Sequence, residues 1–320
     1  MNTDAFKLMI YTSMGAIGGT FLRPISFTLT KERYTPFFTL DFVFDADDYA
    51  HVSVIDIAKV ELLFGDLSIF YGRTAGIRLS LQSGRPLISG KAYGFTKTLA
   101  TSDAVPGMMF DCTLADLAAA NTVMPNVSYQ QASDSASYIY VKESDTIWSA
   151  IAALSIKLYE NYPYITAQNT VNIKKEGQAS LDYTDEKVTE IFSGNSFNNA
   201  VSKIYMQGTQ GTYDYSCTDS EVIRRGIRRD RYIPLDRQWL SDPEMGLKHK
   251  MYFSRRGGAF RGFTYQGFKN EQLCDSLSFS CAGTRYSGEV SKLTVKGDRK
   301  GVFTTVISYH DGYSLIGQAT

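Results

Sequence analysis

Residues Phe37 to Asp45 read FFTLDFVFD, and the large apolar side chains Phe38, Leu40, Phe42 and Phe44 occupy every second position. Side chains two residues apart on an extended chain lie on the same face of a sheet. The spacing therefore predicts a β-strand with one apolar face. We expect this strand to place its phenylalanines in the core of a β-rich domain.

Similar stretches surround this strand throughout the first hundred residues. Most of them end near Gly, Ser or Asp, and they are PISFTLTKER (24–33), VIDIAKVELLFG (54–65), LSIFYGRT (67–74), GIRLSLQSG (76–84) and SGKAYGFTKTL (89–99). Short strands at such regular spacing are typical of a β-barrel or a β-sandwich. We therefore expect residues 1–104 to form one all-β domain.

The pattern changes to a helical period in the middle of the chain. DCTLADLAAAN (111–121) predicts a short helix with Asp111 or Thr113 as its N-cap. In YVKESDTIWSAIAALSIKLY (140–159) a second helix follows a strand, with Ser144 or Asp145 as its expected N-cap. Its apolar stripe is Ile147, Ile151, Leu154 and Leu158, widened by Trp148 and Tyr159. Residues 105–193 are thus predicted to form a compact α+β insert.

The last third returns to strands. The candidates are KIYMQG (203–208), KHKMYFSRR (248–256), FRGFTYQGF (260–268), SLSFSCAG (276–283), SKLTVKGD (291–298) and GVFTTVISYH (301–310). The last two predict a hairpin with a polar turn between them. The chain is therefore expected to be mainly β, with domains at 1–104, 105–193 and 194–320.

Catalytic and metal-binding motifs are not found in the sequence. The three histidines, His51, His249 and His310, form no metal-binding pair, and the Gly15–Gly19 segment is followed by no Lys-Ser or Lys-Thr. Asp45, Asp47 and Asp48 are expected to be solvated turn residues, because acid–base catalysis needs one carboxyl in an apolar setting. The sequence predicts no enzyme, and no catalytic, cofactor-binding or metal-binding residue.

Composition places the chain among globular proteins made in the cytoplasm. Hydrophobic residues make up 43% of it and charged residues 21%. No apolar run reaches the roughly 18 residues that a membrane-spanning helix needs, and no basic segment precedes an apolar one at the N-terminus. The four scattered cysteines are expected to be reduced and mostly buried.

Positive charge is concentrated in the last part of the chain. From Asn195 onward there are eighteen Lys and Arg against twelve Asp and Glu, a net +6, so the first 194 residues carry −6 in a neutral chain. Such a division suits a protein that docks onto copies of itself or onto neighbours of the same polarity. It equally suits two domains that pack together within one chain.

Four arginines form a candidate partner interface. If EVIRRGIRRDRYI (221–233) is helical, Arg224, Arg225, Arg228 and Arg229 cover an arc of about 140°, at roughly 100° per residue. An acidic protein partner, simple solvation and nucleic acid are the three interpretations of this face. A second basic stretch, SRRGGAFRGFTYQGF (254–268), has the look of an Arg-Gly-Gly RNA-binding segment, but flanking strand patterns favour an edge strand with its turn.

The Tyr140–Tyr159 stretch resembles the start of a LysM glycan-binding repeat, in which a strand, a Gly-Asp-Thr turn and a Trp- or Leu-bearing helix follow in order. Ser144 stands here where that repeat has its glycine. The resemblance implies peptidoglycan binding. The alternative, which we favour, is that the strand and helix serve as a packing block in a larger assembly.

Four segments taken in order carry a broader resemblance. They are the N-terminal strand block closed by SGKAYGFTKTL, YVKESDTIWSAIAALSIKLYENYPYI (140–165), RRDRYIPLDRQWL (228–240) and the SKLTVKGDRKGVFTTVISYH hairpin (291–310). Together they resemble the tail-hub (baseplate hub) proteins of contractile phage tails and of R-type bacteriocins, which are both contractile injection systems. The resemblance covers nearly the whole chain, and it depends on the order of the segments.

This resemblance implies a homotrimer in which each subunit contributes two tube-like β-barrel domains, 1–104 and 194–320, to a ring. Six barrels would then present a nearly sixfold face to the hexameric tail tube, while the other end meets the trimeric central spike. Other baseplate proteins are further expected partners, whereas membranes and specific DNA sites are not. The particle would be a phage tail or a bacteriocin, and the alternative function is a peptidoglycan-binding or cell-wall-degrading tail protein.

Overall fold

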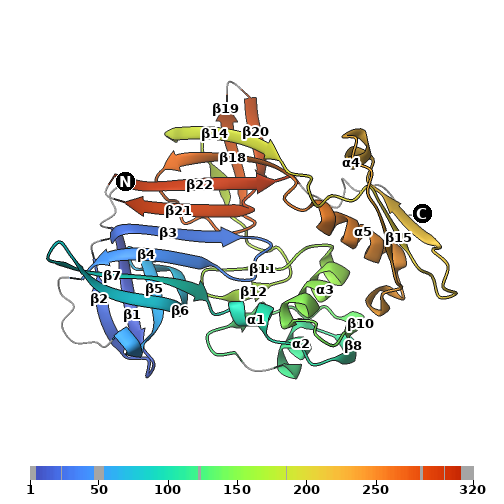
Figure 1. Cartoon of the computed structure of the whole chain (residues 1–320), viewed down its shortest axis with the longest axis horizontal. Helices are drawn as coiled ribbons and strands as arrows, with labels where there is room; N and C mark the ends of the chain where they lie inside the picture. The colour runs from blue at the N-terminus through green and yellow to red at the C-terminus, as the bar shows by residue number, and fades with distance from the viewer. Residues whose placement is uncertain are drawn as a thin grey trace.

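The computed structural model describes residues 5–22, 24–46, 54–121, 124–184, 186–281, 284–298 and 300–310. One eleven-stranded sheet with antiparallel neighbours dominates these residues, which makes the protein mainly β as expected (Figure 1). In spatial order its strands are β14 (Val188–Asn195), β18 (Ala259–Gln266), β22 (Gly301–Tyr309), β21 (Lys292–Asp298), β3 (Pro24–Glu32), β4 (Thr39–Asp45), β7 (Arg85–Gly94), β6 (Leu67–Gln82), β5 (Ile57–Phe64), β1 (Phe6–Thr12) and β2 (Ile17–Phe21).

The alternation of Phe38–Phe44 predicts the local structure correctly. Leu40, Phe42 and Phe44 lie on β4 and are buried, while Asp41 on the opposite face is exposed. On the core face Phe42 is paired with Phe27 of β3. Fully burying a side chain of this size contributes about 1.5–3 kcal/mol, so this face anchors the N-terminal strands to the core.

Two groups of four strands in the large sheet have the same topology. The first unit is β3-β4-β7-β6 and the second is β14-β18-β22-β21, so each unit orders its strands first, second, fourth, third along the chain. Every neighbouring pair across both units is antiparallel. Equivalent strands therefore run in the same direction, and the units are related by a shift of four strands along the sheet.

The two units join edge to edge, which corrects the prediction of two closed barrels. β21 pairs with β3 over seven residue pairs, including Val295 with Leu29, and both side chains are completely buried. The first strand of one unit is therefore paired with the last strand of the other, and cannot close against its own unit. Among the described residues the sheet remains open, with β14 at one edge and β2 at the other.

The middle of the chain carries helices and short strands, and Figure 1 shows α1, α2 and α3 gathered at one end of the large sheet. Thr113 caps α2 in a reciprocal capping box with Asp116. Thr146 caps α3, rather than Ser144 or Asp145, because its hydroxyl accepts from the Ser149 amide. The elements are α1 (Lys97–Thr101), β8 (Gly107–Cys112), α2 (Leu114–Ala120), β9 (Ser128–Tyr129), β10 (Ala136–Val141), α3 (Ile147–Tyr159), β11 (Tyr164–Ile165) and β12 (Thr170–Asn172).

Shorter elements precede the strands of the second unit or are inserted between them. The β16-β15-β17 sheet packs on α5 through its own small core, which includes Ile204, Met206, Leu247 and Met251. These elements are β13 (Ser180–Asp182), β15 (Lys203–Met206), β16 (Tyr215–Thr218), α4 (Ser220–Arg224), β17 (Asp230–Ile233), α5 (Pro243–Arg255), β19 (Ser276–Cys281) and β20 (Thr284–Glu289). The 3-10 helices η2 (Val54–Asp56) and η3 (Arg237–Trp239) complete the described chain.

Two strand predictions in the last third need correction. KHKMYFSRR lies in helix α5, because the Asp242 side chain caps the helix start ahead of Pro243 and buried residues recur at Leu247, Met251 and Arg255. FRGFTYQGF does form strand β18, but this strand lies between β14 and β22 and is not an edge. The domain boundary predicted between residues 193 and 194 falls within β14, and the division into three domains stays a prediction.

Candidate interaction surfaces

The arginine-rich stretch does not form the expected helix. Helix α4 ends at Arg224, and Gly226 follows with a φ of +81°, a left-handed conformation typical of a helix C-terminus. The chain then enters strand β17 at Asp230. Arg224, Arg225, Arg228 and Arg229 therefore lie on a helix end and a loop, and they do not share one helix face.

Two of these four arginine side chains bind neighbouring residues, and the other two are exposed to solvent. The Arg225 guanidinium forms a 2.9 Å ion pair with Glu221 and lies over the Phe197 ring. Arg229 donates to the backbone carbonyl of Asn198 at 2.7 Å. Arg224 and Arg228 are exposed and contact no acidic side chain among the described residues. The surface formed by these four arginines, the arginine surface, thus keeps two cations available for a partner.

A buried ion pair holds this surface in place. Asp219 caps helix α4 by accepting from the amides of Glu221 and Val222. Its other carboxylate oxygen lies 2.9 Å from Arg255 on α5, and Arg255 also reaches Glu221 at 2.7 Å. The hydrogen bond from Arg225, together with Arg255, holds the pKa of the Glu221 carboxyl below its usual value. The arginine surface is therefore fixed on a rigid base.

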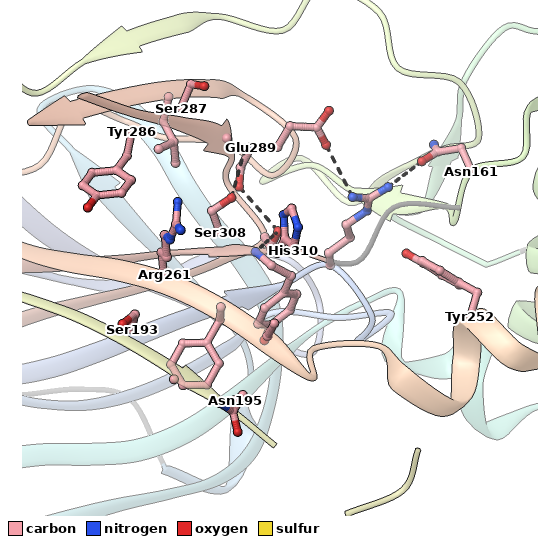
Figure 2. Close-up of a pocket in the computed structure, with 18 of the residues that line it drawn as sticks. Asn161, Ser193, Asn195, Tyr252, Arg261, Tyr286, Ser287, Glu289, Ser308 and His310 are labelled. Carbon is pink, nitrogen blue, oxygen red and sulfur yellow. Dashed lines mark hydrogen bonds and ion pairs between the residues drawn. The ribbon is translucent and has the colours of Figure 1, made fainter. Parts of the chain in front are cut away.

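Next to this surface lies an open cavity of about 950 Å³ (Figure 2). Its wall combines Asn161, which follows α3, with Arg261 of β18, Glu289 of β20 and His310, which follows β22. Arg225 lines both this cavity and a smaller recess of about 540 Å³ that Arg229 also lines. The structure thus brings two of the predicted arginines to the border of a hollowed region.

One polar cluster in the cavity could not be found from the sequence. Arg33 follows β3, far from the last strands in sequence, yet it reaches Glu289 at 3.4 Å and Asn161 at 2.6 Å. Lys175 pairs with the same Glu289 at 2.6 Å. The cluster therefore ties the residue that follows β3 to Asn161 and Lys175 of the middle segment and to strand β20. No local motif signals it, because its members meet only in the folded chain.

The helix that resembles a LysM repeat uses its aromatic side chain for packing. Trp148 is 5% exposed, and its indole nitrogen donates to the Tyr162 hydroxyl at 3.0 Å. The stripe residues Ile147, Ile151 and Leu154 are also buried. This burial favours the interpretation of α3 as a packing block.

Histidine, cysteine and acidic side chains do not gather into a metal site in the described part of the chain. No group of three or more His, Cys, Asp or Glu there could hold a metal ion. Burial lowers the pKa of His249 to about 3, and its ring packs against Trp239 and Phe253. Cys112, Cys217 and Cys274 are buried, as predicted. The predicted turn residues Asp47 and Asp48, together with His51, lie outside the described residues.

None of the described helices has the length and apolar character to cross a membrane.

Comparisons with known proteins identify the fold. No protein-family model matches the chain, and no curated protein matches it at a significant level. Among solved structures, a tail protein from Neisseria meningitidis superposes with a TM-score of 0.74 at 13% identity, over 97% of this chain and 98% of that one. The 43 kDa tail protein of prophage MuSo2 from Shewanella oneidensis gives 0.69 at 13% identity, over 98% and 100%.

A third similar structure comes from a secretion machine. It is an Escherichia coli component of the type VI secretion system, described as structurally similar to two phage T4 tail proteins, with a TM-score of 0.51 at 10% identity over 90% of this chain and 73% of that one. At these low identities the likeness concerns the fold. The resemblance stated from the sequence is thereby confirmed at that level: across nearly its full length this chain has the fold of phage tail and baseplate hub proteins.

Proposed function

We propose that this protein is a structural baseplate hub, a homotrimer whose ring adapts the hexameric tail tube to the trimeric central spike. The supporting observation is the repeated four-strand unit within one sheet. Three chains with two equivalent units each supply six similar segments around an axis, which is the number that a sixfold tube requires. A shift along the sheet preserves strand direction, so all six units can present the same edge to the tube.

The role is mechanical and has no chemical step. In this proposal residues 1–104 and 194–320 carry the ring, residues 105–193 add a docking block, and the assembled particle is a phage tail or a bacteriocin. The arginine surface meets an acidic neighbour, either another baseplate protein or the acidic part of an adjacent copy. The charges of −6 and +6 on the two parts of the chain support such head-to-tail docking.

Two measurements test the trimer and its symmetry. Size-exclusion chromatography with light scattering should give three times the mass of one chain at micromolar concentration, alone or with the spike protein present. Class averages of negatively stained rings viewed along the axis should then show six similar lobes. A strict monomer under both conditions contradicts the proposal, and a trimer with only three lobes contradicts the adapter geometry.

The competing function is wall binding by the insert. A pull-down with purified peptidoglycan distinguishes it cheaply, because a hub whose Trp148 is buried should stay in the supernatant, whereas a glycan-binding repeat should sediment. Sedimentation that depends on residues of the insert would favour the wall-binding function.

A further inference from the structure

The junction between the two strand units has an open counterpart at the ends of the same series. Within the chain, β21, which is the spatially last strand of its unit, pairs with β3, the first strand of the other unit. A shift of four strands carries β21 onto β6 and carries β3 onto the corresponding strand of a following unit. Beside the first half of β6 that place is taken by β5 of the same chain. Beside the second half, the strand equivalent to β3 would be β14 of another copy.

Half of β6 has a free edge that could receive such a strand. β5 pairs with β6 only from Leu67 to Arg73, whereas β7 pairs with it as far as Gln82. The side of residues 76–82 that faces away from β7 therefore has no strand partner among the described residues. β14 ends the sheet on the opposite side, and one of its edges likewise pairs with no strand in the described part of the chain. Unpaired strand edges expose rows of amides and carbonyls that readily pair with another chain.

We propose that residues 76–82 of β6 pair antiparallel with β14 of a neighbouring copy, in the register that β21 and β3 use within one chain. The proposal rests on the trimer proposed above and specifies how its subunits join. Each copy offers one edge and receives the other, so the contact is head-to-tail, and such contacts form a closed ring when the rotation between copies allows it.

The two hairpins set the register on the β6 side. Asp298 faces Gly301 at the end of the β21–β22 hairpin, and Gln82 faces Arg85 at the end of the β6–β7 hairpin. Asp298 and Gln82 are therefore equivalent positions. Counting one residue back from each makes Leu81 the equivalent of Gly297, and counting three residues back makes Leu79 the equivalent of Val295.

The second strands set the register on the β14 side. Phe42 pairs with Phe27 in the first unit, and its equivalent Phe263 pairs with Ile191 in the second, so Ile191 corresponds to Phe27. Phe27 faces Gly297 in the internal junction. The equivalent contact between copies therefore places Ile191 opposite Leu81, and the next position on that face places Ser193 opposite Leu79.

Exposure of apolar side chains agrees with this register. In the internal junction Phe27, Leu29 and Val295 are buried. At the free edges Leu79, Leu81 and Ile191 are 38%, 74% and 38% exposed.

All three exposed side chains belong to the core face of the sheet. Leu79 is paired with the buried Ile88, and Ile191 with the buried Phe263. Joining the two edges would continue the core from one copy into the next, and would place apolar Ile191 against apolar Leu81.

Paired cysteines test the register directly. Leu81→Cys with Ile191→Cys, and separately Leu79→Cys with Ser193→Cys, should form disulfides between copies and give a covalent trimer on a non-reducing gel. Within one chain the two positions are seven strand spacings apart, about 33 Å along the sheet, whereas a disulfide needs Cα atoms within about 7 Å. The matched control is Leu81→Cys with Phe192→Cys, since a slip of one residue turns the side chain to the other face.

The outcomes separate this inference from the trimer itself. Light scattering on each reduced variant reports the oligomer, and the oxidised gel reports the register. A trimer in which neither matched pair links, or in which the Phe192 control links equally well, overturns the pairing and leaves the trimer standing. A monomer in every variant and in the native protein overturns the proposed function.

A charge substitution provides a second measurement. Leu79→Lys with Leu81→Lys should weaken association of the trimer by at least about tenfold, because the edge would carry two cations into an apolar contact. Leu240→Lys, at an exposed position away from both edges, should leave the association unchanged. Equal association in the two variants contradicts the pairing.

Discussion

Arg255 and Asp219 form an ion pair of 2.9 Å between α5 and the start of α4, and both side chains are almost completely buried. The same carboxylate caps α4, so one acidic side chain supports both the helix end and the arginine surface beyond it. A buried charge that loses its partner is costly, since it remains away from water. The pair therefore decides whether this part of the chain is rigid.

Replacing Arg255 tests this dependence. Arg255→Ala should lower the free energy of unfolding by about 3–5 kcal/mol, because Asp219 would stay buried without its partner. Arg256→Ala is the matched control: the Arg256 side chain is exposed and lies over the Phe253 ring, and the expected loss is at most about 1 kcal/mol. Urea denaturation measures the free energy of unfolding of both variants. Equal losses would show that the buried ion pair stabilises the fold no more than the exposed Arg256 side chain does.

Trp148 provides a test of the packing role of α3. Trp148→Ala should destabilise the fold by about 3–5 kcal/mol through the cavity that it leaves. Tyr162→Phe should cost about 1–3 kcal/mol, because the indole nitrogen would lose its acceptor inside the fold. A loss below about 1 kcal/mol for Trp148→Ala would instead indicate an exposed binding face.

Because Lys31 is buried, we expect an unusual dependence of the protein's stability on pH. This side chain is completely buried, and burial lowers its pKa to about 8, although Glu271 and Asp275 oppose that shift. Between pH 8 and 10 the folded protein then binds fewer protons than the unfolded chain. The free energy of unfolding should therefore rise with pH across this range, by up to about 3 kcal/mol.

Other buried groups set the limits of this effect. Burial raises the pKa of the Tyr183 and Tyr265 hydroxyls, so stability should fall again above about pH 10, where these phenols ionise only in the unfolded chain. Lys157, whose pKa burial also lowers to about 8, contributes in the same direction as Lys31. Denaturation of Lys31→Met from pH 7.5 to 10 should show a smaller rise than the native protein, and an identical slope would contradict this assignment.

The arginine surface is tested by reversing the charges that have no partner within the chain. Arg224→Glu with Arg228→Glu should block assembly of tail particles, because an acidic neighbour would meet like charge. The subunit should keep its circular dichroism spectrum and melting temperature, since neither side chain makes an internal ion pair with a described residue. Arg224→Lys with Arg228→Lys retains the charge and should assemble. Normal assembly of the Glu variant would return these residues to ordinary solvated surface.

Much of the candidate interface depended on details that sequence patterns do not carry. The four arginines lie at the surface, but Gly226 ends α4 and separates them, and their role as a partner interface stays a prediction. Arg225 forms an ion pair with Glu221 and lies over the Phe197 ring, and no periodicity in the sequence predicts these contacts. The Asp242-Pro243 pair was a readable signal for α5, since a capping aspartate before proline is typical of a helix start. The strand pattern assigned to KHKMYFSRR was wrong because Leu247, Met251 and Arg255 follow the helical period.

The sequence alone determined which face of each strand is apolar and where several helices begin. Alternation in Phe38–Phe44 specified β4, and Thr113 with Asp116 specified the start of α2, because side-chain period and capping are local properties. Only the tertiary structure decided that β21 pairs with β3 and thereby turns two strand units into one sheet. Backbone amides and carbonyls are the same at every residue, so a strand's pattern indicates its buried face but not its neighbour. That choice leaves β14 and residues 76–82 of β6 with open edges as far as the structure describes the chain.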